Sequence, residues 1–335
     1  MRVFTCTAGA AAVAVGVSIL AGCSGGAALG APTPGLSPQS LMQQAIGAPP
    51  TDPDGAYVVT GTASGQYVIN EYRLNDGKNG KPLCSIAGGT SYFPGDLATD
   101  RHGNLWVPTI ATPSTGSVWE VVEYAPGCGQ SMLSLQDSAT GQPAGVAFNS
   151  KGVVYVANEV SASFGPGNVA VFLPGQTSPS TVLTSPLIGS YVLDIAIDAN
   201  DDVFVTCDTS SFKTEVVEFA KGKGSGAAVN VSGFSVVDGI TFDNHQNMIL
   251  TDYALAQDEV YAPPYSGAPT ATVPLLAGSN PAVSRLNKNN SQLFVTDHTG
   301  YDVYAYPAGT HQYSVTNGMG KFGAGGLALD PKAPN

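Results

Sequence analysis

Polar side chains that could bind a cation or a basic group recur along the chain, each just after a short apolar run. A ring of carboxylates at one level of a repeat would offer negative charge to such ligands. Repetition has a second explanation, because one structural hydrogen bond made in every repeat would select the same residue types. We favour this structural explanation. The six residues are Asn158, Glu159, Asp208, Asp252, Asp297 and His298.

Motifs that carry the common catalytic chemistries are missing from the sequence. It contains no Gly-x-Ser-x-Gly elbow, P-loop, His-Glu-x-x-His or Cys-x-x-Cys pattern. His102 and His245 fall in turns, and a single histidine such as His298 is more typical of a surface hydrogen bond than of a catalytic base. We therefore assign no catalytic residue. The net charge of -12 leaves a nucleic-acid backbone nothing to bind.

The elements that position these side chains form a repeat of about 43 to 49 residues, a period typical of propeller blades. Each copy begins with an apolar strand, an Asp or Asn turn and a second strand, as in "GDLATDRHGNLWVPT" from Gly95 and "DGITFDNHQNMILTD" from Asp238. A third strand ending on an aromatic residue and a looser outer strand follow. Runs such as "VYV" and "VFV" are apolar on both faces, as expected for sheets covered by neighbours on both sides.

The two ends of the chain complete the count of repeats. The segment from Ala56 matches strands two, three and four of the unit, whereas "GGLALDPK" from Gly325 matches strand one. Joining them leaves no open sheet edge. The sequence therefore predicts an all-β fold, a six-bladed β-propeller with four-stranded blades over residues 51–335, closed by pairing of the C-terminal strand with the N-terminal blade. The six polar residues are then candidates for the channel mouth.

The N-terminus is typical of an exported protein. Arg2 precedes an apolar stretch that is too short to span a bilayer, and Leu20-Ala21-Gly22-Cys23 resembles the lipobox of bacterial lipoproteins. The resemblance implies a signal peptide over 1–22 and a lipid on Cys23, with an ordinary secretory signal as the alternative. Residues 23–50, rich in Gly, Ala, Pro and Ser, then form a flexible tether. We expect a bacterial envelope protein held to the membrane by its lipid, with the outer membrane or cell surface favoured.

Three cysteines remain beyond the N-terminal region. Cys84 and Cys128 lie in adjacent repeats near outer strands, and a disulfide between them is left open by the sequence, since only geometry can decide it. Cys207 lies in a strand, where a buried free thiol is expected.

The repeat resembles NHL-repeat propellers and their relatives, the senescence-marker/gluconolactonase family and the streptogramin lyases. The gluconolactonase resemblance implies a divalent cation, Ca²⁺ or Mg²⁺, at the mouth of the central channel. Within "VDGITFDNHQNMIL", Asp238 holds the position of a ligand. Ala144 and Leu193 stand where further ligands are expected, which weighs against a lactonase. Asp194 and Asp96 could complete an oxygen-rich site, although capping of turns by these residues is favoured.

Two functions follow from these observations. The first is an envelope-anchored, NHL-like propeller lipoprotein that acts as a monomeric binding module for a protein, peptide or glycan, to which the sequence assigns no definite cofactor. The alternative is a metal-dependent, lactonase-like hydrolase with its cation at the channel mouth. The anchor, the complete ring and the missing catalytic motifs favour the first.

Overall fold

The chain divides into two units, Met1–Ala45 and Ile46–Asn335, and every described residue belongs to the second. The predicted signal peptide, the tether with Cys23, and His298 lie outside the described residues. The computed structural model describes residues 55–61, 66–74, 81–88, 94–111, 118–137, 141–160, 166–189, 191–209, 213–297, 299–316 and 324–330.

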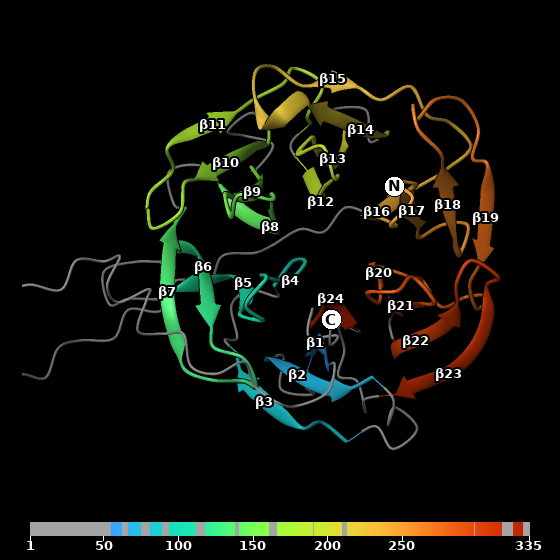
Figure 1. The fold of residues 1–335 in the computed structure, drawn as a ribbon, viewed down its shortest axis with the longest axis horizontal. Helices are drawn as coiled ribbons and strands as arrows, with labels where there is room; N and C mark the ends of the chain where they lie inside the picture. Colours follow the sequence, from blue (N-terminus) through green and yellow to red (C-terminus); the bar gives the residue numbers. More distant parts are fainter. Residues whose placement is uncertain are drawn as a thin grey trace, which may run out of the picture. The chain divides into compact units, whose positions relative to one another are not determined.

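Six four-stranded antiparallel sheets form a ring, and the first strand of each lies nearest the centre (Figure 1). Written from the centre outward, blades 1 to 3 are β24 (Ala324–Leu329), β1 (Gly55–Gly61), β2 (Tyr67–Arg73), β3 (Cys84–Ala87); β4 (Ala98–Thr99), β5 (Leu105–Ala111), β6 (Val118–Tyr124), β7 (Ser131–Gln136); and β8 (Gln142–Phe148), β9 (Val154–Glu159), β10 (Asn168–Phe172), β11 (Thr181–Leu183).

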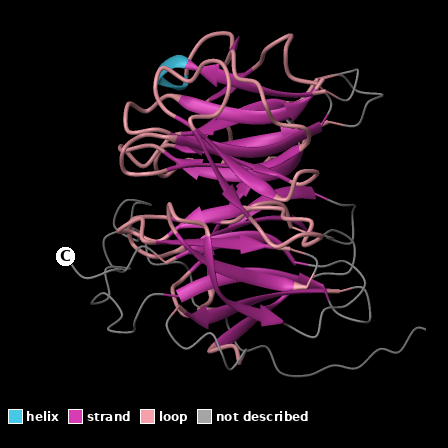
Figure 2. Ribbon diagram, turned by 90° about the vertical axis from the view of Figure 1, so that its right-hand side faces the viewer, coloured by secondary structure: helices cyan, strands magenta, loops and turns pink. Residues whose placement is uncertain are grey.

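Blades 4 to 6 continue the ring with the same strand order. They are β12 (Tyr191–Ile197), β13 (Val203–Asp208), β14 (Thr214–Phe219), β15 (Ala227–Ala228); β16 (Val237–Phe242), β17 (Met248–Asp252), β18 (Gln257–Tyr261), β19 (Ala271–Pro274); and β20 (Ser284–Leu286), β21 (Gln292–Thr296), β22 (Gly300–Ala305), β23 (Thr310–Thr316). In the described part of the chain the helical structure is a single 3-10 turn, Ala220–Gly222, so strands dominate the side view (Figure 2). No described helix has the length and apolar character that crossing a membrane requires.

Blade 1 closes the ring as the sequence predicts. The C-terminal strand β24 pairs antiparallel with β1, with Tyr57 opposite Ala328 and Val58 opposite Leu327. The all-β, six-bladed propeller with four-stranded blades is therefore confirmed, together with its closure from both ends of the chain. A disulfide between Cys84 of β3 and Cys128 of the β6–β7 turn, with Cα atoms 6.0 Å apart, joins blades 1 and 2. The pairing that the sequence left open is thus present.

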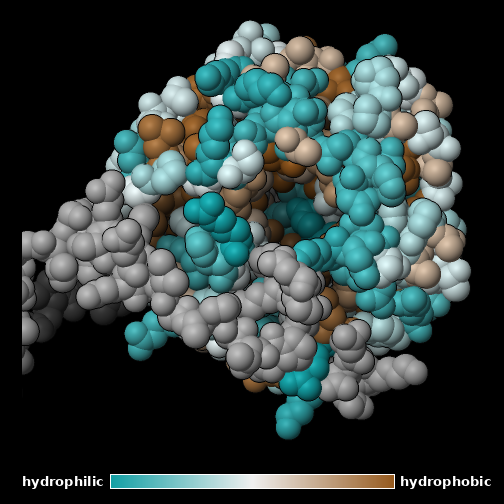
Figure 3. Space-filling view, viewed as in Figure 1, coloured by the Kyte–Doolittle hydropathy of each residue, from teal (hydrophilic) through white to brown (hydrophobic). Residues whose placement is uncertain are grey.

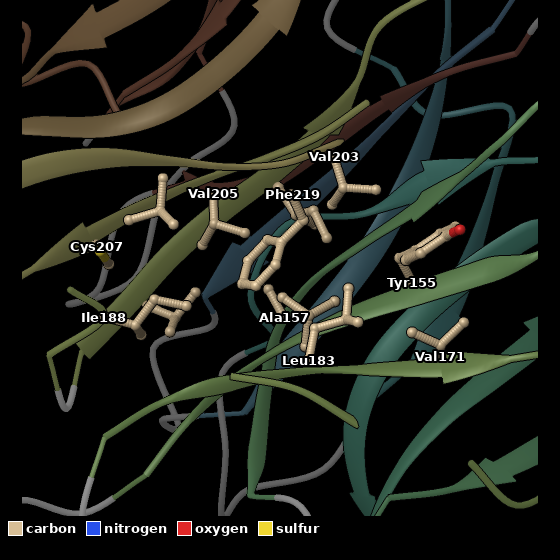
Figure 4. Close-up of a cluster of buried hydrophobic side chains, with 13 residues drawn as sticks. Tyr155, Ala157, Val171, Leu183, Ile188, Val203, Val205, Cys207 and Phe219 are labelled. Carbon is tan, nitrogen blue, oxygen red and sulfur yellow. The ribbon is translucent and has the colours of Figure 1, made fainter. Parts of the chain in front are cut away.

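Each core lies between two neighbouring blades, which explains the apolar runs on both strand faces. Figure 4 shows one such core, where Val205 and Cys207 of β13 and Phe219 of β14 meet Ala157 and Leu183 of blade 3. Equivalent clusters lie at the other five blade interfaces. Cys207 is a buried free thiol, and burial raises its pKa to about 12, so it contributes to packing rather than to nucleophilic chemistry.

The turn between the first and second strands of a blade is built by one recurring side chain. Asp243, for example, accepts hydrogen bonds from the backbone N–H groups of His245 (2.9 Å) and Asn247 (2.8 Å) through one oxygen. Such a side chain mimics a backbone turn and fixes the tight connection. The corresponding residues of other blades are Asp100, Asn149, Asp198 and Asn287.

Candidate functional site

The centre of the ring is hollowed, and hydrophilic residues lie deep in the hollow (Figure 3). One position of the inner strands differs in residue type between the blades. Five blades carry a small residue at this position, and blade 6 carries Arg285. The pairing of each inner strand with its neighbour aligns Ala98, Ala147, Ala196, Thr241, Arg285 and Ala328. A single long cationic side chain therefore stands where the inner strands of the other blades carry small ones.

Arg285 forms ion pairs with two of the predicted cation ligands. Its guanidinium contacts the carboxylate of Asp96, before β4, and lies 3.1 Å from Oδ2 of Asp194 in β12. Its other terminal nitrogen donates to the backbone oxygens of Ile240 (2.9 Å) and Ser284 (2.8 Å). We call Arg285, Asp96 and Asp194 the channel clasp. The clasp connects inner strands of blades that lie far apart in sequence.

Backbone N–H groups hold both carboxylates of the clasp. Asp96 accepts from Leu327 of β24 (3.2 Å), and Asp194 accepts from Ile195 (2.7 Å) and from Ile240 of β16 (2.8 Å). Gly145 of blade 3 leaves room for this arrangement, since a Cβ there would lie 3.3 Å from Oδ1 of Asp194. The inner strands of all six blades therefore meet at or beside the clasp.

Burial and charge oppose each other within the clasp. Burial alone would lower the pKa of Arg285, but Asp194 and Asp96 raise it above its ordinary value. Burial raises the pKa of Asp96 above its ordinary value, a rise that Arg285 opposes and Asp194 reinforces. Because the guanidinium already lies between the two carboxylates, they do not fit a shared divalent-cation site, and a second cation would meet its charge.

The third predicted ligand, Asp238 of β16, has different surroundings. Its partly buried carboxyl makes no hydrogen bond to another described residue. Burial, followed by the charges of Asp208, Asp252 and Asp194, raises its pKa to about 7. Asp208 ends β13 and Asp252 ends β17, at the edge of the ring where the inner strands begin. We call Asp208, Asp238 and Asp252 the acidic mouth.

The other predicted mouth residues mostly order their own loops. Asp252 accepts from the backbone N–H groups of Ser235, Val236, Ala254 and Leu255, and Asp297 accepts from those of Thr299 and Gly300. Asp208 accepts from the Thr214 hydroxyl (3.0 Å), and Asn158 donates to Asn168 (3.2 Å). The bonds of Asp208, Asp252 and Asp297 stay within one blade, whereas Asn158 of blade 3 also hydrogen-bonds the side chain of Asp137, which follows β7 in blade 2. Glu159 is half-buried, and burial raises its pKa.

Exposed apolar side chains lie on the same edge of the ring as the acidic mouth, from beside Asp208 and Asp252 out to the end of the outer strand β19. Tyr191 pairs in register with Asp208, and the N–H of Tyr253 donates to the Val236 oxygen (2.8 Å). Each of them lies at the start of an inner strand, at the end of a second strand, or in a connection between two blades. Because the strands of a blade alternate in direction, these points all lie on one edge of the ring. We call the five residues the mouth patch. They are Tyr191, Val236, Tyr253, Leu255 and Leu276.

Sequence reasoning missed Arg285 and the mouth patch. The "AVSRLNKN" copy carries Arg where the other copies carry Ala or Thr, and this exception was the available signal. The patch residues come from connections that differ in length and sequence between blades, so no repeat pattern identifies them.

Comparison with known proteins supports the fold. No family model matches the chain, and no curated protein matches it. A chain of the nidogen/laminin complex is similar, with a TM-score of 0.61, 11% identity, and coverage of 83% of this chain and 98% of that chain. A protein of unknown function from Bacteroides caccae is also similar, with a TM-score of 0.61, 10% identity, and coverage of 84% and 100%. At this identity the likeness shows the fold alone, a six-bladed β-propeller.

Proposed function

We propose that the chain is an exported, lipid-anchored binding module that recognises a protein segment carrying basic and apolar side chains at the channel mouth. The observation that carries this proposal is the mouth patch lying beside the acidic mouth. Leu255 is 49% exposed and Leu276 is 41% exposed. Apolar side chains grouped beside buried negative charge favour a partner with the opposite charge and its own apolar groups.

The channel clasp favours binding over hydrolysis at a channel cation. Two of the three carboxylates that a lactonase-like site would use are bonded to Arg285. Asp238 alone offers one ligand, which is fewer than a Ca²⁺ or Mg²⁺ site takes. The resemblance to NHL-repeat and gluconolactonase propellers thus supports a similar fold, while the paired carboxylates favour binding over lactone hydrolysis. One structural neighbour comes from a protein–protein complex, which agrees with a binding role.

The lipid on Cys23 and the envelope location belong to the same proposal, supported by the lipobox resemblance. A lipid and a flexible spacer would hold the propeller close to a membrane surface without inserting it. Replacing Cys23 with Ala should move the protein from the membrane fraction to the soluble fraction. Membrane retention of that variant would contradict the anchor.

Binding at the mouth is tested with two peptides of equal length, one alternating Lys and Leu and the other alternating Glu and Leu. The residue-51-to-335 propeller should bind the first, more weakly as salt rises, and should not bind the second. Leu255→Asp should weaken binding about tenfold or more, as expected for a central interface residue. Leu173→Asp is the matched control, because Leu173 is 45% exposed and follows β10 away from the mouth. Equal loss in both variants would contradict the proposal.

A further inference from the structure

A second site, unrelated to the mouth, lies between blades 5 and 6. A cavity of about 290 Å³ is bounded by the 243–247 turn, the 289–290 part of the next blade's turn, strands β18 and β19, and Tyr306-Pro307. These turns join first to second strands and third to fourth strands, so they lie on the edge of the ring opposite the mouth. The volume lies at the small end of the range for ligand pockets.

The one carboxylate in this cavity is fully used within the protein. Oδ1 of Asp243 accepts from the backbone N–H groups of His245 and Asn247, and Oδ2 accepts from the Asn247 amide (2.7 Å) and the Tyr306 hydroxyl (3.0 Å). Asp243 is 4% exposed. It therefore shapes the wall without offering charge to a ligand, and a cationic ligand would have no free partner there.

Apart from the imidazole of His245, the remaining polar lining consists of uncharged groups and carries both donors and acceptors. Carboxamides provide most of it, and each offers an oxygen acceptor and an N–H₂ donor. Asn247 spends its amide nitrogen on Asp243 and keeps its oxygen, while Asn289 accepts from the Ser291 hydroxyl (2.8 Å) and keeps its nitrogen. The lining amides are Asn244, Asn247, Asn289 and Asn290, and that of Asn290 is occupied, since it donates to the Asn287 oxygen (3.1 Å) and accepts from Asn244.

Apolar groups complete the cavity on its other side. Val260 and Val273 are buried beneath it, and Ala271 and Pro307 border it. A ligand that suits such a site has hydroxyl groups around its edge and an aliphatic C–H face. Sugar rings have this character, since each hydroxyl both donates and accepts and the ring face packs against apolar or aromatic surfaces.

From this combination we propose that the groove between blades 5 and 6 binds one ring of a neutral saccharide. The lining amides hydrogen-bond the hydroxyls, and Pro307 and Tyr306 contact the ring face. The proposal stands apart from the mouth, because the two sites share no residue and lie on opposite edges of the ring.

Binding is tested by saturation-transfer NMR and titration of the propeller with glucose, galactose, mannose, N-acetylglucosamine and glucuronate. At least one neutral sugar should bind saturably, and glucuronate should bind at least fivefold more weakly than that sugar, because its carboxylate would approach the negative charge of Asp243 in the wall. Saturable binding of none of the neutral sugars, or preference for glucuronate, would overturn the proposal.

Two variants locate the binding. Asn244→Ala combined with Asn289→Ala should weaken the affinity about tenfold, and the turn tolerates the first change because blade 4 carries Ala199 at that position. Ala271→Phe, at an exposed strand position, should fill the groove and abolish binding. His102→Ala, in the blade 2 turn, is the control and should bind as the wild type does. Unchanged affinity in both groove variants would overturn the assignment, and Leu255→Asp should leave sugar binding intact whatever it does to peptide binding.

Discussion

Asp194 and Asp238 lie in the inner strands of neighbouring blades, but their carboxyl groups have different surroundings. Asp194 is fully buried, ion-paired with Arg285 and bonded to two backbone N–H groups. Asp238 lies close enough to feel the charge of Asp194 but has no hydrogen bond to another described residue. A partly buried charge that makes no hydrogen bond to the described residues costs free energy, so it persists where another requirement retains it. The comparison separates a channel interior whose charges are paired from the acidic mouth, for which we propose a role in binding.

The strongest test of the interior removes β24. A chain ending before Ala324 loses the inner strand of blade 1 and the Leu327 N–H that holds Asp96. It also exposes the edge of β1. We expect loss of cooperative unfolding in calorimetry, with exposed apolar surface detected by dye binding. A truncated chain that melts at the temperature of the intact one would show that the ring does not depend on its closure.

Replacing Arg285 with Met tests the clasp itself. The variant keeps an unbranched apolar stem but lacks the guanidinium, so it leaves Asp96 and Asp194 buried without their counter-charge. Breaking a buried ion pair from one side costs about 3–5 kcal/mol. Chemical denaturation should show a loss of this size, and Arg285→Lys should recover part of it. A loss below about 1 kcal/mol, the range of surface pairs, would mean that the clasp is not structural.

The pH dependence of stability tests the buried carboxyls as a group. Burial raises the pKa of Asp137 and of Glu259 to about 8, and that of Asp238 to about 7. A carboxyl whose pKa is higher in the folded chain than in the unfolded chain stabilises the fold while protonated, and this contribution is lost as the pH rises through the folded value. The free energy of unfolding should therefore fall between about pH 4 and pH 8. Denaturant titrations at several pH values measure it, and a flat or rising profile would contradict the assigned environments.

The smallest expected effect on stability comes from Asp238→Asn. The substitution removes a charge that makes no hydrogen bond to a described residue, so the free energy of unfolding at pH 8 should rise by about 1 kcal/mol or stay unchanged. The slope of stability against pH should also decrease. A clear loss of stability would show that Asp238 takes part in a structural contact, and the contrast with Asp194 would fail.

The repeat made the fold predictable, because turn residues and apolar strands recur in every blade and the missing strand of blade 1 stands at the other end of the chain. It also identified Asp96, Asp194 and Asp238, but without distinguishing them. Whether an acidic side chain is paired depends on which side chain crosses the channel, and Arg285 does so from a blade far away in sequence. The exposure of the Tyr253 and Leu255 side chains was not predictable either. It depends on how the connection between strands packs, which its composition does not show.

The central claim, that the clasp serves the ring and the mouth serves a partner, is tested most directly by measuring two quantities on the same two variants. Arg285→Met and Asp238→Asn are each characterised by their free energy of unfolding and by their affinity for the Lys-Leu peptide at a temperature where both are folded. We predict that Arg285→Met loses stability and retains affinity within about twofold, whereas Asp238→Asn retains stability and loses about fivefold or more in affinity. The opposite pattern, or a loss of both quantities in both variants, would contradict the account.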